Sequence, residues 1–273
     1  MEIIPGREVA QKILARLKSR PTPLKILAAV LVGKDPASIS FLNQKEKAAK
    51  ELSVDFRIYS LGESLPESEL KEEIRRIAEN DSVGGIIVQL PVPPHINREE
   101  ILSVIPQGKD VDVLGKEARE SFSAGGNPVL PPAVGVVQEL LTTYNLQLTT
   151  KTVAVVGLGF LVGKPIAEWL RSQVKELLEL DKGSDFSLLK NADLVISGVG
   201  IPGLIKPEML KEEVNVIDFG YGVNTEGKLS GDFVPPASDG QSLTGWHTPT
   251  PGGTGPILVA KLLENFYTLS EEV

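Results

Sequence analysis

The feature that most constrains the fold is a series of short apolar runs, each of which ends at a glycine or a proline. Residues 26–32 read ILAAVLV before Gly33, and residues 153–156 read VAVV before Gly157. A strand that is apolar along its whole length is typical of a parallel sheet covered by helices on both faces. Helical patterns lie between the runs, so the chain is predicted to be an α/β protein.

The first half of the chain contains three such strand patterns. We expect strands at 26–32, 54–59 and 85–90, and helices at 8–17, 37–52 and 67–79. Asp35 or Ser38 is placed to begin the second of these helices. Residues 109–132 are rich in Gly, Pro and Ser and have weak periodicity, so we expect them to form a loop and connection.

A second α/β series follows. We expect helices at 134–144, 163–172, 186–190 and 257–266, strands at 152–157, 174–180, 194–198 and 214–218, and a polar, glycine-rich stretch at 220–245. The economical interpretation is two α/β domains with a cleft between them. An N-terminal substrate domain would cover residues 1–145 and a Rossmann-like dinucleotide-binding domain residues 146–253, with the last helix, 254–273, returning to the first domain.

Composition excludes several classes of protein. The chain has 273 residues, a net charge of −8, no cysteine and two histidines, His95 and His247. Without a basic stripe we expect no nucleic-acid partner, and without cysteines or a histidine cluster we expect no disulfide and no metal site. The start, MEIIPGREVA, does not resemble a signal peptide, and the apolar runs are shorter than the roughly 20 residues that span a bilayer. We therefore expect a cytoplasmic protein without a membrane partner.

The turn after residues 153–156 predicts a dinucleotide site. Gly157, Gly159 and Gly163 lie between a strand and a helix, where glycines permit a tight turn, close approach of a pyrophosphate and close helix packing. Gly198 and Gly200 end a second strand where the cofactor would pass. The alternative is a turn that is glycine-rich only because it packs tightly. The first domain has no such turn.

Polar residues in the first domain suggest a second site. Gln89 ends an apolar strand, Asp110 and Asp112 follow in the loop KDVDV, and Lys45 lies on the helix after the first strand. In open parallel sheets, ligands bind at the carboxyl ends of the strands, where Gln89 and the region before Lys45 are expected. The alternative for each is an ordinary solvated side chain.

Together these segments resemble the bifunctional methylenetetrahydrofolate dehydrogenase/methenyltetrahydrofolate cyclohydrolase family over nearly the whole chain. The most specific match is TPTPGGTGP at 248–256. The other matching segments are VGKDPASISFLNQK at 32–45, GGIIVQLPVP at 84–93, GKDVDV at 108–113, GFLVGKP at 159–165, NADLVISGVGIPG at 191–203 and VIDFGY at 216–221.

The resemblance implies an activity and a set of site residues. A nicotinamide dinucleotide would oxidise 5,10-methylenetetrahydrofolate, and water would open the methenyl product to 10-formyltetrahydrofolate. Lys45 would be the central cyclohydrolase residue, oriented by Gln89, while Asp112 would bind the pterin. The resemblance also implies a homodimer formed through the dinucleotide domain. Further substrate contacts would come from Phe41, Pro251, Gly252 and Gly253, and cofactor contacts from Gly157, Gly159, Phe160, Leu161, Val162, Gly163, Asp181, Lys182, Gly198, Val199, Gly200 and Thr254.

Three departures from the family pattern bear on specificity. Phe41 stands where the family usually has tyrosine, which keeps a ring for stacking but removes a hydroxyl. The segment LPPAVG at 130–135 lacks the usual basic residue. Residues 178–185, LELDKGSD, replace the segment that commonly holds the 2′-phosphate of NADP.

The third departure favours NAD over NADP. Asp181 is expected at the end of the second strand of the dinucleotide fold, about 20 residues after the glycine turn, where a carboxylate accepts hydrogen bonds from the ribose and repels a 2′-phosphate. Lys182 and Ser184 would suit a phosphate, and Asp181 could instead cap the next helix. Two other functions stay open: a two-domain dehydrogenase of the shikimate or amino-acid type, and a non-catalytic paralogue that binds folate or dinucleotide.

Overall fold

The computed structural model describes residues 1–236 and 243–271 and divides the chain into two compact units. The three-stranded unit contains residues 11–132 and 259–273, and the six-stranded unit contains residues 1–10 and 133–258. The division differs from the expected boundary after residue 145 in two ways. The first ten residues belong with the second half of the chain, because β1 (Glu2–Ile3) pairs with β11 (Trp246–His247). The helix before residue 145 also belongs to the six-stranded unit.

The three-stranded unit is built on a parallel sheet in the order β3-β2-β4. Its central strand, β2, is buried along its whole length, as the unbroken apolar run predicts. The expected third strand ends slightly earlier than the apolar pattern, so Gln89 follows the strand and is not part of it. The bounds are β2 Ile26–Val32, β3 Phe56–Leu61 and β4 Val83–Val88.

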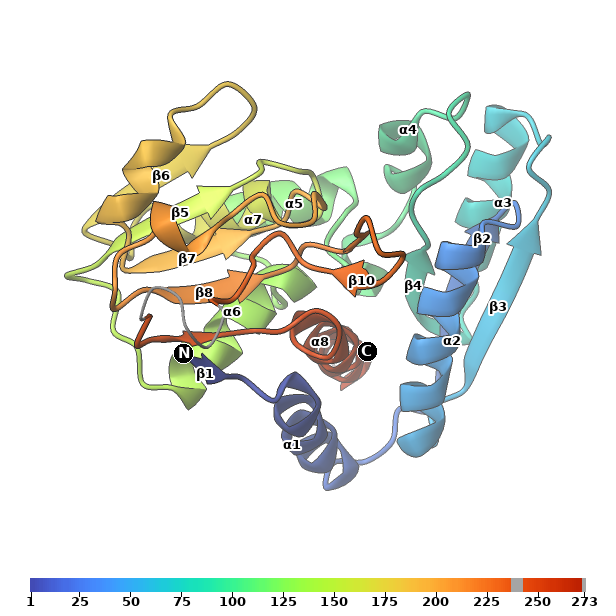
Figure 1. The fold of residues 1–273 in the computed structure, drawn as a ribbon. Coiled ribbons are helices and arrows are strands. Elements are labelled where there is room, and N and C mark those ends of the chain that lie inside the picture. The colour runs from blue at the N-terminus through green and yellow to red at the C-terminus, as the bar shows by residue number, and fades with distance from the viewer. Residues whose placement is uncertain (237–242, 272–273) are drawn as a thin grey trace. The chain divides into compact units, whose positions relative to one another are not determined.

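Helices cover this sheet, and α2 packs against β2 and β3 (Figure 1). Asp35 caps α2 by accepting a 2.7 Å hydrogen bond from the Ser38 amide, and Pro36 occupies the first turn, where its missing N–H costs nothing. The bounds are α1 Gly6–Lys18, which begins in the six-stranded unit, α2 Pro36–Glu51, α3 Glu67–Glu79, α4 Arg98–Leu102, η1 Gln107–Lys109 and α5 Lys116–Ser123.

The expectation of an irregular connection at 109–132 is wrong in part, because α5 lies within it. The helix has eight residues, of which only Ala118 is fully buried. One buried position gives too short an apolar stripe for a helical period to be recognised in the sequence.

The six-stranded unit contains a wholly parallel sheet in the order β1-β11-β8-β7-β5-β6. Strands β5, β6, β7 and β8 match the expected positions to within two residues at either end. A short antiparallel ribbon, β9–β10, lies within the glycine-rich stretch, of which residues 237–242 are outside the described part of the chain. The bounds are β1 Glu2–Ile3, β5 Thr152–Val156, β6 Glu176–Leu180, β7 Leu194–Ser197, β8 Asn215–Asp218, β9 Gly222–Val223, β10 Leu229–Ser230 and β11 Trp246–His247.

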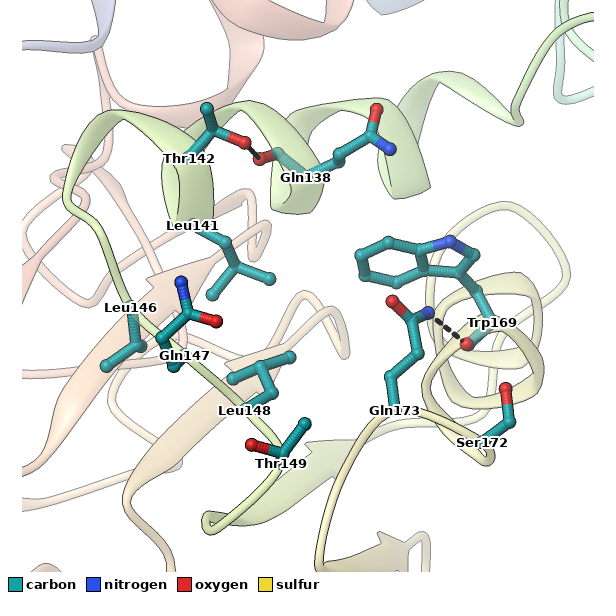
Figure 2. A pocket seen from close by; sticks show the side chains of 10 residues that line it. All are labelled: Gln138, Leu141, Thr142, Leu146, Gln147, Leu148, Thr149, Trp169, Ser172 and Gln173. Carbon is teal, nitrogen blue, oxygen red and sulfur yellow. Dashed lines mark hydrogen bonds between the residues drawn. The ribbon is translucent and has the colours of Figure 1, made fainter.

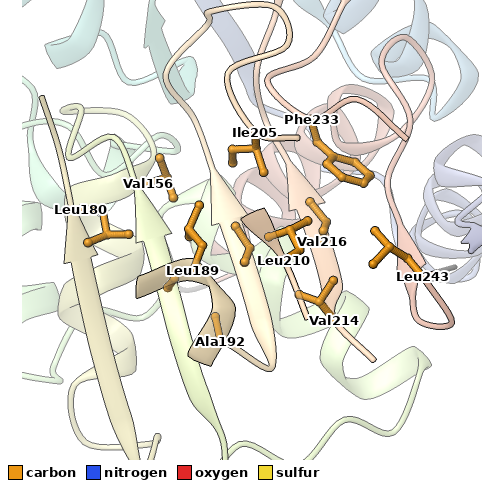
Figure 3. Close-up of a cluster of buried hydrophobic side chains, with 12 residues drawn as sticks. Val156, Leu180, Leu189, Ala192, Ile205, Leu210, Val214, Val216, Phe233 and Leu243 are labelled. Carbon is orange, nitrogen blue, oxygen red and sulfur yellow. The ribbon is translucent and has the colours of Figure 1, made fainter. Parts of the chain in front are cut away.

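A cluster of apolar side chains covers one face of this sheet (Figure 3). Val156, Val195 and Val216 come from three neighbouring strands, and Leu189 and Phe233 come from segments that cross over them. Burial of this kind stabilises by roughly 1.5–3 kcal/mol per large side chain. The helical segments of the unit are α6 Pro132–Thr143, α7 Gly163–Leu170, η2 Phe186–Asn191 and η3 Pro207–Met209.

The last helix, α8 (Thr254–Glu271), has 18 residues and passes from the six-stranded unit into the three-stranded unit after residue 258. Phe266 and Tyr267 are its largest buried side chains. In the three-stranded unit, Asn265 donates 2.8 Å hydrogen bonds to the carbonyls of Val111 and Leu130. Neither α8 nor another helix within residues 1–236 and 243–271 is long and apolar enough to cross a bilayer.

Candidate functional site

Lys45 and Gln89 form the centre of a polar site in the three-stranded unit. The Lys45 ammonium, on α2, donates a 3.0 Å hydrogen bond to Gln89 Oε1, just beyond the end of β4. Gln89 is 7% exposed, and its amide nitrogen donates to the Leu90 carbonyl at 2.7 Å. That second bond fixes which end of the amide faces the lysine, since a flipped amide would lose both hydrogen bonds. The structure therefore brings together two residues that are 44 positions apart in the sequence.

Asp112 is electrostatically coupled to Lys45. Burial lowers the pKa of the Lys45 ammonium, and the negative charge of Asp112 opposes that effect. Burial likewise raises the pKa of the Asp112 carboxyl, and the positive charge of Lys45 opposes it. Each group thus keeps its partner charged more readily than burial alone would allow.

Asp110 organises the loop that carries Asp112, a role that sequence reasoning did not assign. Its carboxylate is 1% exposed and accepts hydrogen bonds from the amides of Leu114 at 2.9 Å and Gly115 at 2.6 Å. Burial raises its pKa to about 6, although these donors oppose the shift. Val113, between the two ends of this clamp, has φ 56°, which is unfavourable for a β-branched residue. The clamp therefore holds a conformation that the loop would not adopt alone.

Phe41 lies one helical turn before Lys45 on α2. Residues four apart occupy the same side of a helix, so the ring and the ammonium share one face. The ring is 37% exposed, which leaves part of its surface available for stacking. Phe41 is thus close in the structure to the residues with which the sequence analysis grouped it.

The glycine turn lies between β5 and α7 of the six-stranded unit, as predicted. Gly157 has φ +82°, a conformation that strongly favours glycine. A Cβ on Gly163 would lie 1.8 Å from the Gly157 carbonyl oxygen, so the helix can approach the turn only if that side chain is absent. A Cβ on Gly159 would meet no atom of the described chain within 4 Å. The turn therefore fits a phosphate-binding role, because protein packing does not explain Gly159.

The remaining predicted cofactor residues lie along this turn and at the end of β7. Leu161 and Val199 are partly exposed, whereas Val162 packs so closely that a Cβ on Gly198 would lie 2.7 Å from its methyl group. Gly200 has φ +79°. Phe160 is half-buried.

Asp181 directly follows β6, in the register expected from the sequence. It is exposed, and its carboxylate accepts a 2.8 Å hydrogen bond from the Lys182 amide, while its own amide donates to Ser184 Oγ at 2.9 Å. The cap of η2 is Asp185, which accepts from the Ser187 amide. The alternative role for Asp181 as a helix cap is therefore wrong.

The segment before α8 belongs to the six-stranded unit. Gly252 has φ +98°, and a Cβ on Gly253 would lie 2.4 Å from the Pro249 carbonyl oxygen. Thr254 is 6% exposed, and its hydroxyl donates to the Asp218 carbonyl at 3.0 Å. These contacts show that the local fold is enough to explain why glycine, glycine and threonine occupy positions 252–254. The predicted substrate contacts of Pro251, Gly252 and Gly253 and the cofactor contact of Thr254 stay predictions.

A separate cleft of about 380 Å³ lies between α6, α7 and the connection into β5 (Figure 2). Leu141, Leu148 and Trp169 form its apolar wall, and Gln173 is tied to the Trp169 carbonyl by a 2.5 Å hydrogen bond. Its lining residues include no acid, base or nucleophile other than hydroxyl and amide groups, so we do not assign it to catalysis. In the described residues there is also no group of three or more His, Asp and Glu side chains that could hold a metal ion.

Comparison with known proteins finds one family model for each half of the chain. The family model described as tetrahydrofolate dehydrogenase/cyclohydrolase, catalytic domain, matches residues 4–112, and the model of its NAD(P)-binding domain matches residues 131–273. The bifunctional protein FolD of Staphylococcus saprophyticus is 33% identical over 272 residues, which cover 97% of this chain and 95% of that protein.

Solved structures give the same result. The bifunctional methylenetetrahydrofolate dehydrogenase/cyclohydrolase FolD of Campylobacter jejuni has a TM-score of 0.92 and 32% identity, covering 100% of this chain and 99% of that one. The methylenetetrahydrofolate dehydrogenase-cyclohydrolase of Trypanosoma brucei, solved with NADP and an inhibitor, has a TM-score of 0.89 and 27% identity, covering 99% and 97%.

The two glycines of the turn provide a matched test. Gly163→Ala is expected to destabilise the protein by about 1–3 kcal/mol, because the new methyl group must displace the Gly157 carbonyl. Gly159→Ala is expected to unfold at nearly the wild-type temperature but to bind dinucleotide more weakly. Thermal unfolding and dinucleotide titration of both variants are the measurements. Equal stability losses in the two variants would contradict this assignment.

Proposed function

Because the chain belongs to the tetrahydrofolate dehydrogenase/cyclohydrolase family, we propose that it oxidises 5,10-methylenetetrahydrofolate and hydrolyses the methenyl product to 10-formyltetrahydrofolate. This assignment replaces the alternative of a shikimate-type or amino-acid dehydrogenase. The observation that carries the proposal is the hydrogen bond from the Lys45 ammonium to Gln89, with Asp112 close enough to affect the Lys45 pKa.

Lys45 acts as the base of the cyclohydrolase reaction in this proposal. A lysine is a base only when it is unprotonated, and burial lowers the pKa of Lys45 toward the range where that form is populated. Gln89 orients the nitrogen through a neutral amide, so it adds no negative charge that would favour the protonated form. The base takes a proton from water as the water oxygen attacks the methenyl carbon, and opening of the ring leaves the formyl group on N10.

Phe41 and Asp112 bind the folate in this proposal. The exposed part of the Phe41 ring stacks on the pterin, and the Asp112 carboxylate accepts hydrogen bonds from its donor-rich edge. Both lie in the three-stranded unit with Lys45. Phenylalanine keeps the stacking surface that tyrosine would give, so its presence is compatible with folate binding.

The six-stranded unit binds the nicotinamide dinucleotide, which accepts the hydride from the substrate. The turn at 157–163 fits the pyrophosphate, because Gly159 is open to approach and α7 begins directly after the turn without a side-chain cap. The segment at 198–200 follows the neighbouring strand β7 and is proposed to contact the same cofactor.

We propose NAD as the preferred dinucleotide. Asp181 follows β6, the strand beside β5, and its exposed carboxylate is not used to cap η2. A carboxylate in this place accepts hydrogen bonds from the ribose hydroxyls and repels a 2′-phosphate. Ser184, one of the two phosphate-compatible residues, already accepts a hydrogen bond from the Asp181 amide. Lys182 is exposed and is a nearby cation that would oppose this preference.

We also propose a homodimer that forms through the six-stranded unit, as the family resemblance implies. Analytical ultracentrifugation is the direct measurement. A monomer at micromolar concentration would contradict the proposal without affecting the assignment of either activity.

Lys45→Met is expected to lower methenyl hydrolysis by about 100-fold or more, because it removes the base. Hydride transfer should stay measurable, since it depends mainly on how the substrate is positioned. Lys47→Met, which changes an exposed lysine on the same helix, is the control and should leave both activities unchanged. Hydrolysis at the wild-type rate in Lys45→Met would contradict the assignment of Lys45 as the base. A wild-type protein with neither activity would favour the alternative of a non-catalytic paralogue.

Asp112→Asn is expected to shift the pH profile of hydrolysis to lower pH. The negative charge of Asp112 raises the Lys45 pKa, so its removal lowers that pKa further, and the unprotonated base becomes populated at lower pH. The measurement is kcat for methenyl hydrolysis between pH 6 and 9, corrected for spontaneous hydrolysis. An unchanged profile, or a shift to higher pH, would show that the two groups are not coupled as proposed.

Asp181→Ser is expected to move the cofactor preference toward NADP by about tenfold or more, because it removes the charge that repels the 2′-phosphate. The measurement is kcat/KM for NAD and for NADP in the wild type and the variant. Asp185→Ser is the control: it removes a nearby carboxylate that caps η2, and it should change the cofactor preference less than Asp181→Ser does. A wild-type preference for NADP would show that Lys182, rather than Asp181, governs the choice.

A further inference from the structure

Two carboxylates are buried at the end of the six-stranded sheet, and neither belongs to the residues predicted from the sequence. Asp218 is the last residue of β8 and is 2% exposed, and Asp232 follows β10 and is 0% exposed. A buried carboxylate is costly unless hydrogen-bond donors surround it. The residues that donate hydrogen bonds to each aspartate are therefore the residues that it holds in place.

Asp232 holds the segment that follows β7. Its carboxylate accepts hydrogen bonds from Ser197 Oγ at 2.6 Å, from the Val199 amide at 2.7 Å and from the Ile201 amide at 2.7 Å. Three donors on alternate residues bind one side chain, so this side of the segment faces inward. The side chains of Val199 and Ile201 are 37% and 53% exposed and face outward.

Backbone contacts reinforce this arrangement. The Ile205 amide donates to the Asp232 carbonyl at 2.8 Å, and the Gly203 amide donates to the Gly231 carbonyl at 3.1 Å. A Cβ on Gly220 would lie 2.3 Å from the Asp232 carboxyl carbon, so this glycine makes room for the carboxylate. Segments 198–205 and 231–234 are thus bonded to each other, and the Asp232 carboxylate lies at the centre of these contacts.

Asp218 has the same burial but different partners. Its carboxylate accepts hydrogen bonds from the Gly220 amide at 2.7 Å and the Phe233 amide at 2.9 Å, and neither donor lies within residues 198–201. Burial raises its pKa to about 6, opposed by the Phe233 amide and supported by the charge of Asp232. It is therefore a matched control for the effect of an aspartate that is merely buried.

We propose that Asp232 is a positioning residue for the dehydrogenase reaction, which fixes residues 198–201 in the conformation that contacts the dinucleotide. The inference rests on the proposed function, in which this segment is part of the cofactor site. Asp232 does not touch the cofactor itself. It acts by holding two amides inward, which sets the outward surface that the segment presents.

The test compares Asp232→Asn with Asp218→Asn in the full chain. Asparagine has nearly the same shape, but its NH₂ group cannot accept the amide hydrogen bonds that one carboxylate oxygen receives. The measurements are KM and kcat for the dinucleotide in the oxidation, the rate of methenyl hydrolysis without dinucleotide, and the unfolding temperature. For Asp232→Asn we expect a rise in dinucleotide KM of about tenfold, kcat within about threefold of wild type, and unchanged hydrolysis.

Asp218→Asn is expected to lose comparable thermal stability while its dinucleotide KM stays within about threefold of the wild type. A purely structural role for Asp232 would lower stability in both variants and leave KM unmoved in both, which would overturn the inference. An equal rise of KM in the two variants would also overturn it.

Ser197→Ala keeps the test decisive if Asp232→Asn does not fold. It removes one of the three donors, so KM should rise by about threefold, and an unchanged KM would overturn the inference. A wild-type chain that bound neither NAD nor NADP would overturn the proposed function itself. If instead the wild type and the variants all bind dinucleotide equally well, only the inference about Asp232 is overturned.

Discussion

The backbone hydrogen bonds at the carboxyl edge of the six-stranded sheet align the segments that follow its strands. The Gly157 amide donates to the Leu180 carbonyl, the Gly198 amide to the Val156 carbonyl, and the Phe219 amide to the Ser197 carbonyl. In each pair the residue after one strand bonds to the last residue of its neighbour. Parallel strands all end at the same edge, so this pattern places the glycine turn and the 198–201 segment side by side. The proposed cofactor site is therefore a consequence of strand register.

Asp232 in the six-stranded unit and Lys45 in the three-stranded unit are both at least partly removed from solvent, but they differ in the number of their hydrogen-bond partners. Asp232 accepts three hydrogen bonds, which hold residues 197–201 in one conformation. Lys45 donates to one neutral amide and has one carboxylate nearby, so burial lowers its pKa. A buried group with several hydrogen-bond partners is held in one place, whereas a buried group with few partners has a shifted pKa that suits proton transfer with a substrate. These differences agree with the proposed positioning role of Asp232 and the proposed role of Lys45 as a base.

The sequence predicts most of the fold because its apolar periods are local. The strands around residues 26–32 and 152–157 were found from unbroken apolar runs, and the helix at residues 67–79 from its amphipathic pattern. The strands β1 and β11 have two residues each and exist only because they pair with partners far away in the chain, so no local period reveals them. The same limit applies to Asp232, whose three donors lie 31 to 35 positions earlier. The position of Gln89 and of the region before Lys45 at the carboxyl ends of strands suggests a site that includes Asp112, and the family resemblance gives each residue a role, whereas periodicity alone would leave each as a possible surface residue.

The glycines of the turn show what the structure adds to a motif. In the sequence Gly157, Gly159 and Gly163 are expected to serve a tight turn, close approach of a pyrophosphate and close helix packing, but a tightly packed turn would also explain all three. In the structure they have different causes: a positive φ requires Gly157, and the Gly157 carbonyl excludes a side chain at position 163. Neither cause applies to Gly159, where a methyl group would meet no described atom within 4 Å. A glycine costs roughly 0.5–1 kcal/mol in unfolded-state entropy relative to alanine, so its use at an open position needs another reason. Close approach of a ligand to the backbone provides that reason, and it separates a binding turn from one that is merely compact.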